Sequence, residues 1–433
     1  MSHPLRPGSS RRGVLRGLGA AGLAGLAAPL LPRRTAAASV SASDRRFIFV
    51  QVLGGWDVTR AFAPLFGAEA VSMEPDAAET SAGDLVYVTH PERPSVDAYF
   101  ADWGDQTVVV NGLYVPSISH HSATRLMLTA VVDAAYADWG TRIATAHADA
   151  HVVPYLVAGG ANYAGAHGVH IGRAGTNGQL PGLATGALLV TADVPMPIPS
   201  SGASSIVDRY LASAAAVRAA QEAAGGRASA LESYEIALDR AARLKDIAAE
   251  VDLSTDTSFE GQTALAMRAL SNGISRCVSI SYPQSNSGVE WDTHAANDLK
   301  QSPLFEGLFA GLSELLVALA ETPGTVGATL AHETTVVVLS EMGRTPFNNG
   351  SGGKDHWPYT SAMFIGQGVA GGRVIGAFND DQFGEKIDLS SGDLDEGGIA
   401  IGNDVIGATI LQLAGLDLGD ERIGAEPIAG LMT

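Results

Sequence analysis

Two short, almost uninterrupted apolar runs constrain the fold of this chain more than any other feature. Residues 47–53 read FIFVQVL and residues 334–339 read TTVVVL, so neither run alternates with polar positions. Strands of this kind need cover on both faces, as they have in parallel sheets with crossover helices.

Further strand-like runs are found at 106–110, 152–157, 187–191, 277–282 and 362–365. Helical patterns cover 122–135, 262–275, 302–321 and 403–413. This alternation predicts a mostly parallel α/β sheet with helices on both faces.

An Ala-rich stretch interrupts this alternation. Residues 205–251 carry regularly spaced Leu, Ile and Tyr, and Gly225-Gly226 divides them. The pattern predicts two helices. We expect them to form a helical cap or lid inserted at about 203–255 into a single domain of residues 39–433.

The N-terminus carries an export signal. Residues 10–15 read SRRGVL, a twin-arginine motif, and an apolar run at 18–31 precedes the small residues 36–38. A membrane anchor is the alternative, but the apolar run is shorter than the roughly 20 residues of a spanning helix. We therefore expect residues 1–38 to be a signal peptide that engages the twin-arginine export machinery. Cleavage near Ala38 would leave a periplasmic or secreted protein.

The charge balance limits the possible partners. The 433 residues have a net charge of −19, and residues 1–38 contain six Arg and no acid. Removing them leaves 21 basic residues against 46 acidic ones, a net charge of about −25. This balance argues against nucleic-acid binding, which needs a basic surface. Cys277 is the single cysteine, so the chain cannot form an internal disulfide. We expect Cys277 to be buried and to pack as a small apolar side chain.

Polar clusters lie at or near the ends of the apolar runs. They read GGWD at 54–57, WDTH at 291–294, SEMGRT at 340–345 and KDHW at 354–357. Open α/β sheets bind ligands at the carboxyl ends of their parallel strands. The clusters supply carboxylates and imidazoles suited to a divalent ion such as Zn, Mn, Mg or Ca. The candidate metal ligands are Asp57, Asp292, His294, Glu341 and His356.

Each candidate also has an alternative role. Asp57 follows two glycines and could instead cap a helix or turn. Asp292 and His294 are two residues apart and converge on one ion only if their loop bends. A Gly- and Asn-rich loop at 348–353 could bring Glu341 and His356 together. Arg344 could hold this loop or bind an anionic substrate.

A nucleophile is expected at the start of a helix, where backbone N–H groups favour an anion. Ser119, Ser122 and Thr124 are the candidates, and helix capping by Ser122 is the alternative. Two histidine pairs, His147/His151 and His167/His170, could also bind a metal. Because no carboxylate stands at a matching spacing, we expect these four to be surface or structural histidines.

The ordered clusters resemble the twin-arginine-exported family called domain of unknown function 1501, within the alkaline phosphatase/sulfatase superfamily. The resemblance covers nearly all of residues 46–415. It rests on GGWD at 54–57, Ser119-His120, WDTH at 291–294, SEMGRT at 340–345, Asp355-His356 and the closing helix 404–415. It implies an alkaline-phosphatase-like fold.

The resemblance also implies roles for individual residues. Asp57 would match the superfamily's first metal carboxylate, and Ser119 would match its nucleophile. Asp292, His294, Glu341 and His356 would match the later ligands. Two-zinc phosphatases have a histidine where this chain has Met342. Their Asp and His that correspond to Asp292 and His294 are also further apart in sequence. A single metal site, or one built differently, is therefore an alternative to a two-zinc site. The formylglycine motif of sulfatases is absent, because residues 278–280 after the only cysteine read VSI.

Two functions follow as hypotheses. The first is an exported metal-dependent hydrolase of small anionic phosphate or sulfate-type esters, with Ser119 as nucleophile and Arg344 stabilising charge. The second is a non-catalytic cell-envelope binding or assembly protein that retains the fold. A metal-free serine hydrolase is a weaker third hypothesis, because the sequence contains no Gly-x-Ser-x-Gly motif.

Overall fold

A computed structural model describes most of the chain after residue 39. The described residues are 40–174, 180, 201–223, 228–248, 251, 253, 256–283, 290–416 and 424–433. The predicted signal peptide 1–38, the strand expected at 187–191 and the break at Gly225-Gly226 lie outside them.

The core is an eight-stranded sheet with the order β12-β4-β11-β8-β1-β7-β5-β6. Its strands are β1 Arg46–Gln51, β4 Thr107–Tyr114, β5 Tyr155–Val157, β6 Ile171–Arg173, β7 Cys277–Ser281, β8 Thr334–Leu339, β11 Tyr359–Gly366 and β12 Arg373–Ile375. β11 is antiparallel to both of its neighbours, and every other pair of neighbours in this sheet is parallel. The predicted mostly parallel sheet is confirmed.

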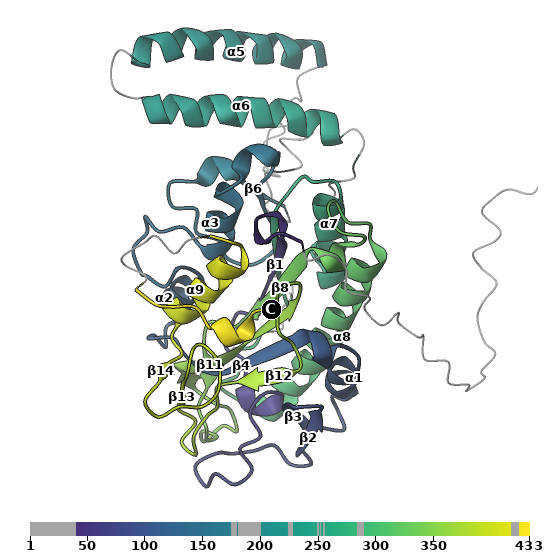
Figure 1. The fold of residues 1–433 in the computed structure, drawn as a ribbon, viewed down its shortest axis with the longest axis vertical. Helices are drawn as coiled ribbons and strands as arrows, with labels where there is room; N and C mark the ends of the chain where they lie inside the picture. The colour runs from purple at the N-terminus through teal and green to yellow at the C-terminus, as the bar shows by residue number, and fades with distance from the viewer. Residues whose placement is uncertain are drawn as a thin grey trace, which may run out of the picture. The chain divides into compact units, whose positions relative to one another are not determined.

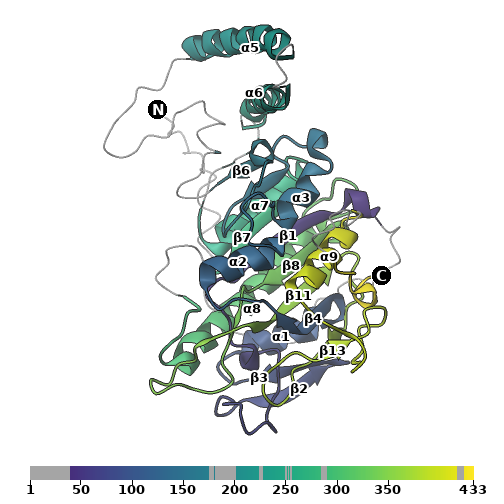
Figure 2. The ribbon, with the colours of Figure 1, turned by 90° about the vertical axis from the view of Figure 1, so that its left-hand side faces the viewer.

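Helices cover both faces of this sheet (Figure 1). On one side lie α1 Pro94–Trp103, α7 Phe259–Ser271 and α8 Asn297–Glu321. On the other side, which faces the viewer in Figure 2, lie α2 His120–Thr129, α3 Trp139–Thr145 and α9 Asn403–Leu413. Alternate residues of β1 pack into different cores, Ile48 and Val50 with the first set of helices and Phe47 and Phe49 with the second. A strand buried on both faces is apolar at nearly every position, which explains the run at 47–53.

The helix α8 begins five residues before the predicted start at residue 302. Its length and mean hydropathy would also suit a membrane span. Its apolar stripe is buried in the protein core, however, with Leu308, Phe309 and Leu312 fully covered. The stripe therefore serves as the inner face of a core helix.

Smaller elements complete the domain. They are the hairpin β2 Ala78–Ala82 and β3 Leu85–Thr89, the ribbon β9 Gly343–Arg344 and β10 His356–Trp357, and the pair β13 Lys386–Ile387 and β14 Ile399–Ala400. Short 3-10 helices span Ala42–Asp44, Val58–Arg60, Gly104–Gln106, Ala148–Ala150, Gly168–His170, Leu330–His332 and Ala429–Leu431. The β9–β10 ribbon carries part of the candidate site.

The region of the predicted cap contains two long helices, α5 Ser201–Ala223 and α6 Ala228–Ala248. An ion pair joins them, with 2.8 Å between Lys245 Nζ and Asp208 Oδ2. Arg240 of α6 donates hydrogen bonds to the carbonyl oxygens of Ala148 and Val169. A role for this pair as a lid stays a prediction.

The sheet gathers the predicted functional loops at one edge. β1, β4 and β8 point the same way, because β8 pairs parallel with β1 and β11 runs antiparallel to both β4 and β8. The segments that follow these three strands, 52–57, 115–119 and 340–342, therefore leave the sheet at its carboxyl edge.

Candidate metal centre

The loop after β1 turns sharply through two glycines. Gly54 and Gly55 have φ values of +120° and +80°, which favour glycine. A Cβ atom on Gly54 would lie 3.0 Å from the backbone nitrogen of Asp292. The Gly54 nitrogen donates to the two carboxylate oxygens of Glu341, at 2.8 and 3.1 Å. The glycines thus allow three distant segments to approach one another closely.

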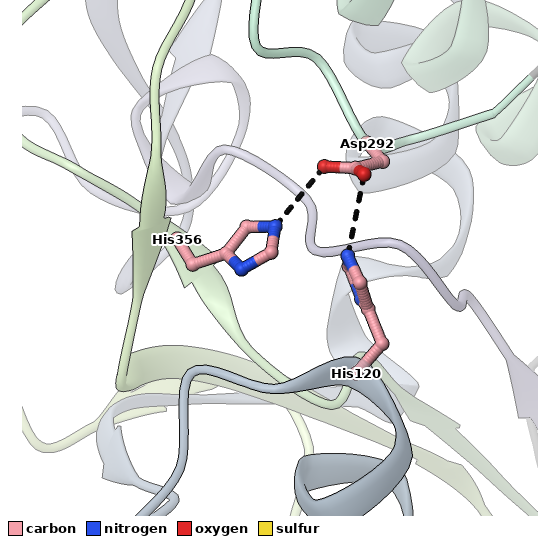
Figure 3. A group of neighbouring side chains, drawn as sticks. All are labelled: His120, Asp292 and His356. Carbon is pink, nitrogen blue, oxygen red and sulfur yellow. Dashed lines mark hydrogen bonds and ion pairs between the residues drawn. The ribbon is translucent and has the colours of Figure 1, made fainter.

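At this meeting point, His120, Asp292 and His356 direct side chains toward one another (Figure 3). One nitrogen or oxygen from each residue lies within 4.8 Å of the other two. His120 Nε2 is 3.4 Å from Asp292 Oδ2, and His356 Nε2 is 3.2 Å from Asp292 Oδ1. Two imidazoles and a carboxylate are ligands that zinc and similar divalent ions bind.

His294 adds a third imidazole at the solvent side. Its Nε2 atom lies 3.1 Å from Asp292 Oδ1 and 3.0 Å from His356 Nε2. Its side chain is 49% exposed, whereas that of His356 is 19% exposed. The structure therefore brings together Asp292, His294 and His356 of the predicted ligand set, on a side that solvent reaches.

The second nitrogen of each imidazole explains its orientation. All three histidines direct Nδ1 at an oxygen that can only accept a hydrogen bond. The acceptors are Glu341 Oε1 for His120 at 2.7 Å, Asp355 Oδ1 for His294 at 2.8 Å and the Ile118 carbonyl for His356 at 2.6 Å. A neutral imidazole that donates from Nδ1 has a lone pair on Nε2. Metal-binding histidines in proteins are commonly held by such outer acceptors.

The Asp292 carboxylate is kept ionised. Burial alone would raise its pKa, but the hydrogen bond and charge of Arg344 outweigh burial and lower the pKa to about 2. The distance from Arg344 Nη2 to Asp292 Oδ1 is 2.7 Å. His120 shows the opposite effect, since its hydrogen bond to Glu341 raises its pKa against the lowering effect of burial. The centre therefore attracts a cation or a proton.

Arg344 itself does not reach solvent. Its side chain is fully buried, and its guanidinium donates to the carbonyl oxygens of Gly54, Gly55 and Lys354 as well as to Asp292. The N–H groups that would bind an anionic substrate therefore donate to protein acceptors instead. The prediction that Arg344 binds the substrate is wrong. Arg344 has the alternative role, in which it holds the loop, and it also orients Asp292.

Glu341 also differs from its predicted role. It is 1% exposed, and its oxygens accept from His120 and from the Gly54 nitrogen. Glu341 thereby supports His120 rather than facing the group that His120, Asp292 and His356 form. The neighbouring Met342 is buried in the core on the α2, α3 and α9 side of the sheet.

Asp57 takes other partners. Its side chain caps the 3-10 helix Val58–Arg60 by accepting a hydrogen bond from the Thr59 nitrogen at 3.1 Å. Helix capping is the alternative role predicted for Asp57. One of its oxygens lies 3.1 Å from Arg60 Nε and 3.0 Å from Lys354 Nζ. Burial would raise the pKa of Asp57, but these two cations lower it below the usual range. With its charge already balanced, Asp57 does not fit the expected role of metal ligand.

The nucleophile candidates occupy different environments. Ser119 is exposed, immediately precedes α2, and makes no capping hydrogen bond through its side chain. Ser122 is half-buried, and Thr124 is only 7% exposed. Ser119 is therefore the most exposed residue of the three, and it is adjacent in sequence to His120.

The other histidine pairs have structural contacts. His151 Nε2 is 3.0 Å from an Arg46 nitrogen, and burial lowers the pKa of His151 to about 4. Burial and then Arg240 likewise lower the pKa of His170 to about 4. Cys277 is buried, and burial raises its pKa to about 12. A neutral thiol at this pKa is unreactive at physiological pH.

His120 is the residue of the centre that is not among the ligands predicted from the sequence. The available signal was its position: it follows β4, whose carboxyl end lies at the same sheet edge as those of β1 and β8. A histidine at such an edge is a ligand candidate even when no carboxylate is near in sequence.

The solved structures that are similar to the chain include the following three. A lipoteichoic acid synthase, LtaP from Listeria monocytogenes, is 9% identical with a TM-score of 0.41, over 90% of this chain and 77% of that one. An alkaline phosphatase superfamily protein from Vibrio parahaemolyticus is 10% identical with a TM-score of 0.39, over 88% and 69%. The PsFucS1 sulfatase from Pseudoalteromonas sp. is 11% identical with a TM-score of 0.38, over 86% and 68%.

No curated protein sequence matches the chain. Residues 98–417 match the family described as "Protein of unknown function (DUF1501)". This match spans well over half of the chain and includes His120, Asp292, His294 and His356. The chain belongs to the DUF1501 family.

Proposed function

We propose that this protein is an exported metal-dependent hydrolase of phosphate- or sulfate-type esters. The observation that carries the proposal is the convergence of three imidazole Nε2 atoms on one carboxylate. The three Nε2 atoms lie 3.1–3.4 Å from the Asp292 oxygens, close enough for a cation or a proton to be shared between them. We propose that a divalent ion occupies this position, bound by His120, Asp292, His294 and His356.

The donor set favours one class of ion. Three imidazole nitrogens and one carboxylate suit zinc and other transition metals, whereas magnesium and calcium prefer oxygen ligands. Of the ions considered from the sequence, zinc fits best. When bound, such an ion would lower the pKa of an adjacent hydroxyl and stabilise negative charge on ester oxygens.

The protein's own groups supply the remaining chemistry. Ser119 is an exposed residue at the N-terminus of the ten-residue helix α2, where the helix dipole favours an anion. We propose that its Oγ attacks the phosphorus or sulfur of the ester as the bond to the alcohol oxygen breaks, and that water then releases the acid. The outer partners Glu341, Asp355 and the Ile118 carbonyl hold the imidazoles in position during these steps.

Replacement of Ser119 by alanine tests this role. In zinc-loaded protein assayed with phosphate monoesters, phosphate diesters and sulfate esters, we expect Ser119→Ala to lower kcat/KM by roughly 1,000-fold on the best substrate. A matched control is Ser313→Ala, since the Ser313 hydroxyl in α8 donates only to the Phe309 carbonyl. Turnover by Ser119→Ala equal to that of Ser313→Ala would remove Ser119 as the nucleophile.

One observation favours a second candidate function, a non-catalytic envelope protein that holds an ion. Arg344, the cation expected to bind the substrate, is fully buried and bound to protein acceptors. The same assay separates the two candidates. A protein that binds one ion yet hydrolyses none of the three ester classes would support the second.

We also propose export through the twin-arginine machinery, on the strength of the SRRGVL motif and the apolar run that follows it. The mature protein would begin at Ser39. Mass spectrometry of protein recovered from its native host tests this, and a cytoplasmic chain that retains residues 1–38 would contradict it.

A further inference from the structure

Two of the three segments that carry the proposed ligands, 291–294 and 354–357, are linked to one buried ion pair. Asp57 and Lys354 are both fully buried, and their charged atoms are 3.0 Å apart. Asp57 belongs to the loop after β1, whereas Lys354 immediately precedes Asp355 and His356. A buried, paired charge of this kind has few alternative positions, because leaving its partner costs desolvation without compensation.

A chain of hydrogen bonds links Asp57 to the first ligand segment. Asn297 donates to Asp57 Oδ2 at 2.8 Å and accepts from the Thr293 hydroxyl at 2.6 Å. Gln301 accepts from the Asp57 nitrogen at 2.6 Å and donates to the same hydroxyl at 3.0 Å. Thr293 is fully buried and lies between Asp292 and His294 in the chain. Its hydroxyl is therefore the point at which Asp57 fixes those two residues.

Lys354 connects the same pair to the second ligand segment. Its backbone nitrogen donates to the Thr293 carbonyl at 3.1 Å. Its own carbonyl accepts from Arg344, which also donates to Asp292. The segments 291–294 and 354–357 are thereby joined by a main-chain hydrogen bond and by the side chain of Arg344.

The charges around this pair are balanced without a metal ion. Three acids and three bases make up the network: Asp57, Glu74, Asp298, Arg60, Arg93 and Lys354. Arg60 contacts all three acids, at 3.1 Å to Asp57, 3.2 Å to Glu74 and 2.6 Å to Asp298, and Arg93 lies 2.5 Å from Glu74. A divalent ion at Asp57 would have to displace Lys354 and leave an uncompensated excess of positive charge.

We infer that Asp57 and Lys354 are a positioning pair that sets the spacing between Asp292, His294 and His356, so that the centre takes one divalent ion whose affinity depends on this buried network. The inference rests on the proposed metal centre. In this inference Asp57 does not contact the ion, but it raises the affinity of the centre for the ion by holding Thr293 in place.

The variant Thr293→Val tests the inference. Valine keeps the shape of threonine but cannot join Asn297 and Gln301. We expect zinc affinity, measured on the full chain by competition with a chromophoric chelator, to fall by about 10- to 100-fold, as for other outer partners of metal ligands. Thr293→Ser retains the hydroxyl and should stay within about threefold of wild type.

A matched control is Thr335→Val. Thr335 is also fully buried, and its hydroxyl donates to the Gln367 carbonyl near the opposite end of β8. We expect its zinc affinity to equal that of wild type. If Thr293→Val does not fold, Gln301→Met carries the same test with the same expected loss.

The outcomes separate this inference from the proposed function. Wild-type affinity in folded Thr293→Val or Gln301→Met overturns the inference while leaving the metal centre in place. Two ions per wild-type chain, falling to one in Asp57→Asn, would also overturn it, because Asp57 would then be a ligand. A wild-type chain that binds no zinc overturns the proposed function and the inference together.

Discussion

Replacement of Asp292 by asparagine is expected to weaken zinc binding by more than about 100-fold, beyond the range seen for outer partners of metal ligands. The carboxylate faces the Nε2 atoms of His120, His294 and His356 at 3.1–3.4 Å, so it supplies the negative charge that offsets a divalent ion. Asparagine removes this charge but keeps an oxygen that can accept from Arg344, so the fold should persist. Chelator competition, with circular dichroism as the test of folding, measures both effects.

Asp393→Asn is the matched control for this prediction. Asp393 is exposed and pairs with Arg373 at 3.0 Å, so the same loss of charge occurs at the surface. We expect wild-type zinc affinity in this variant. Equal affinities in the two variants would mean that the ion binds elsewhere in the chain.

Replacement of Lys354 by methionine is expected to lower the free energy of unfolding by roughly 3–5 kcal/mol, because it leaves Asp57 buried without one of its two cations. Burial already lowers the pKa of Lys354, and the charge of Asp57 opposes that shift. Urea denaturation in the presence of a chelator measures the loss without any contribution from bound metal.

Two further variants show whether this loss belongs to the ion pair. The double variant Asp57→Asn/Lys354→Met has no uncompensated charge and should regain part of the stability. Lys386→Met changes an exposed lysine and should stay within about 0.5 kcal/mol of wild type. If Lys354→Met lowers the free energy of unfolding by less than about 1 kcal/mol, this would contradict the inference that Asp57 and Lys354 are a positioning pair.

Much of the fold could be predicted because buried parallel strands leave a strong local pattern. Residues 334–339 form a strand with the predicted bounds, and the helix at 403–413 also begins and ends as predicted. The helix predicted at 122–135 covers 120–129 instead, because Ala130 adopts a left-handed conformation with φ of 62° and ends it. The apolar pattern continues past this point in Val131 and Val132, which is why the sequence alone placed the end too late.

The candidate site was predicted only in part, for a physical reason. Asp292, His294 and His356 stand in polar clusters near strand ends, and topology alone brings such clusters together. The roles of Asp57 and Arg344 depend on partners far away in the chain, such as Lys354 for Asp57 and Gly54 for Arg344. Sequence spacing carries no information about these partners, so a balanced buried charge could not be told from a free one.

The ion content of the exported protein tests the central claim most directly. Protein purified from its native host without added metal and analysed by inductively coupled plasma mass spectrometry should contain one divalent ion per chain. We expect dialysis against a chelator to remove this ion, zinc to restore it, and Asp292→Asn to lack it. A wild-type chain without a stoichiometric ion that also fails to take up zinc would contradict the account, as would an ion that Asp292→Asn retains in full.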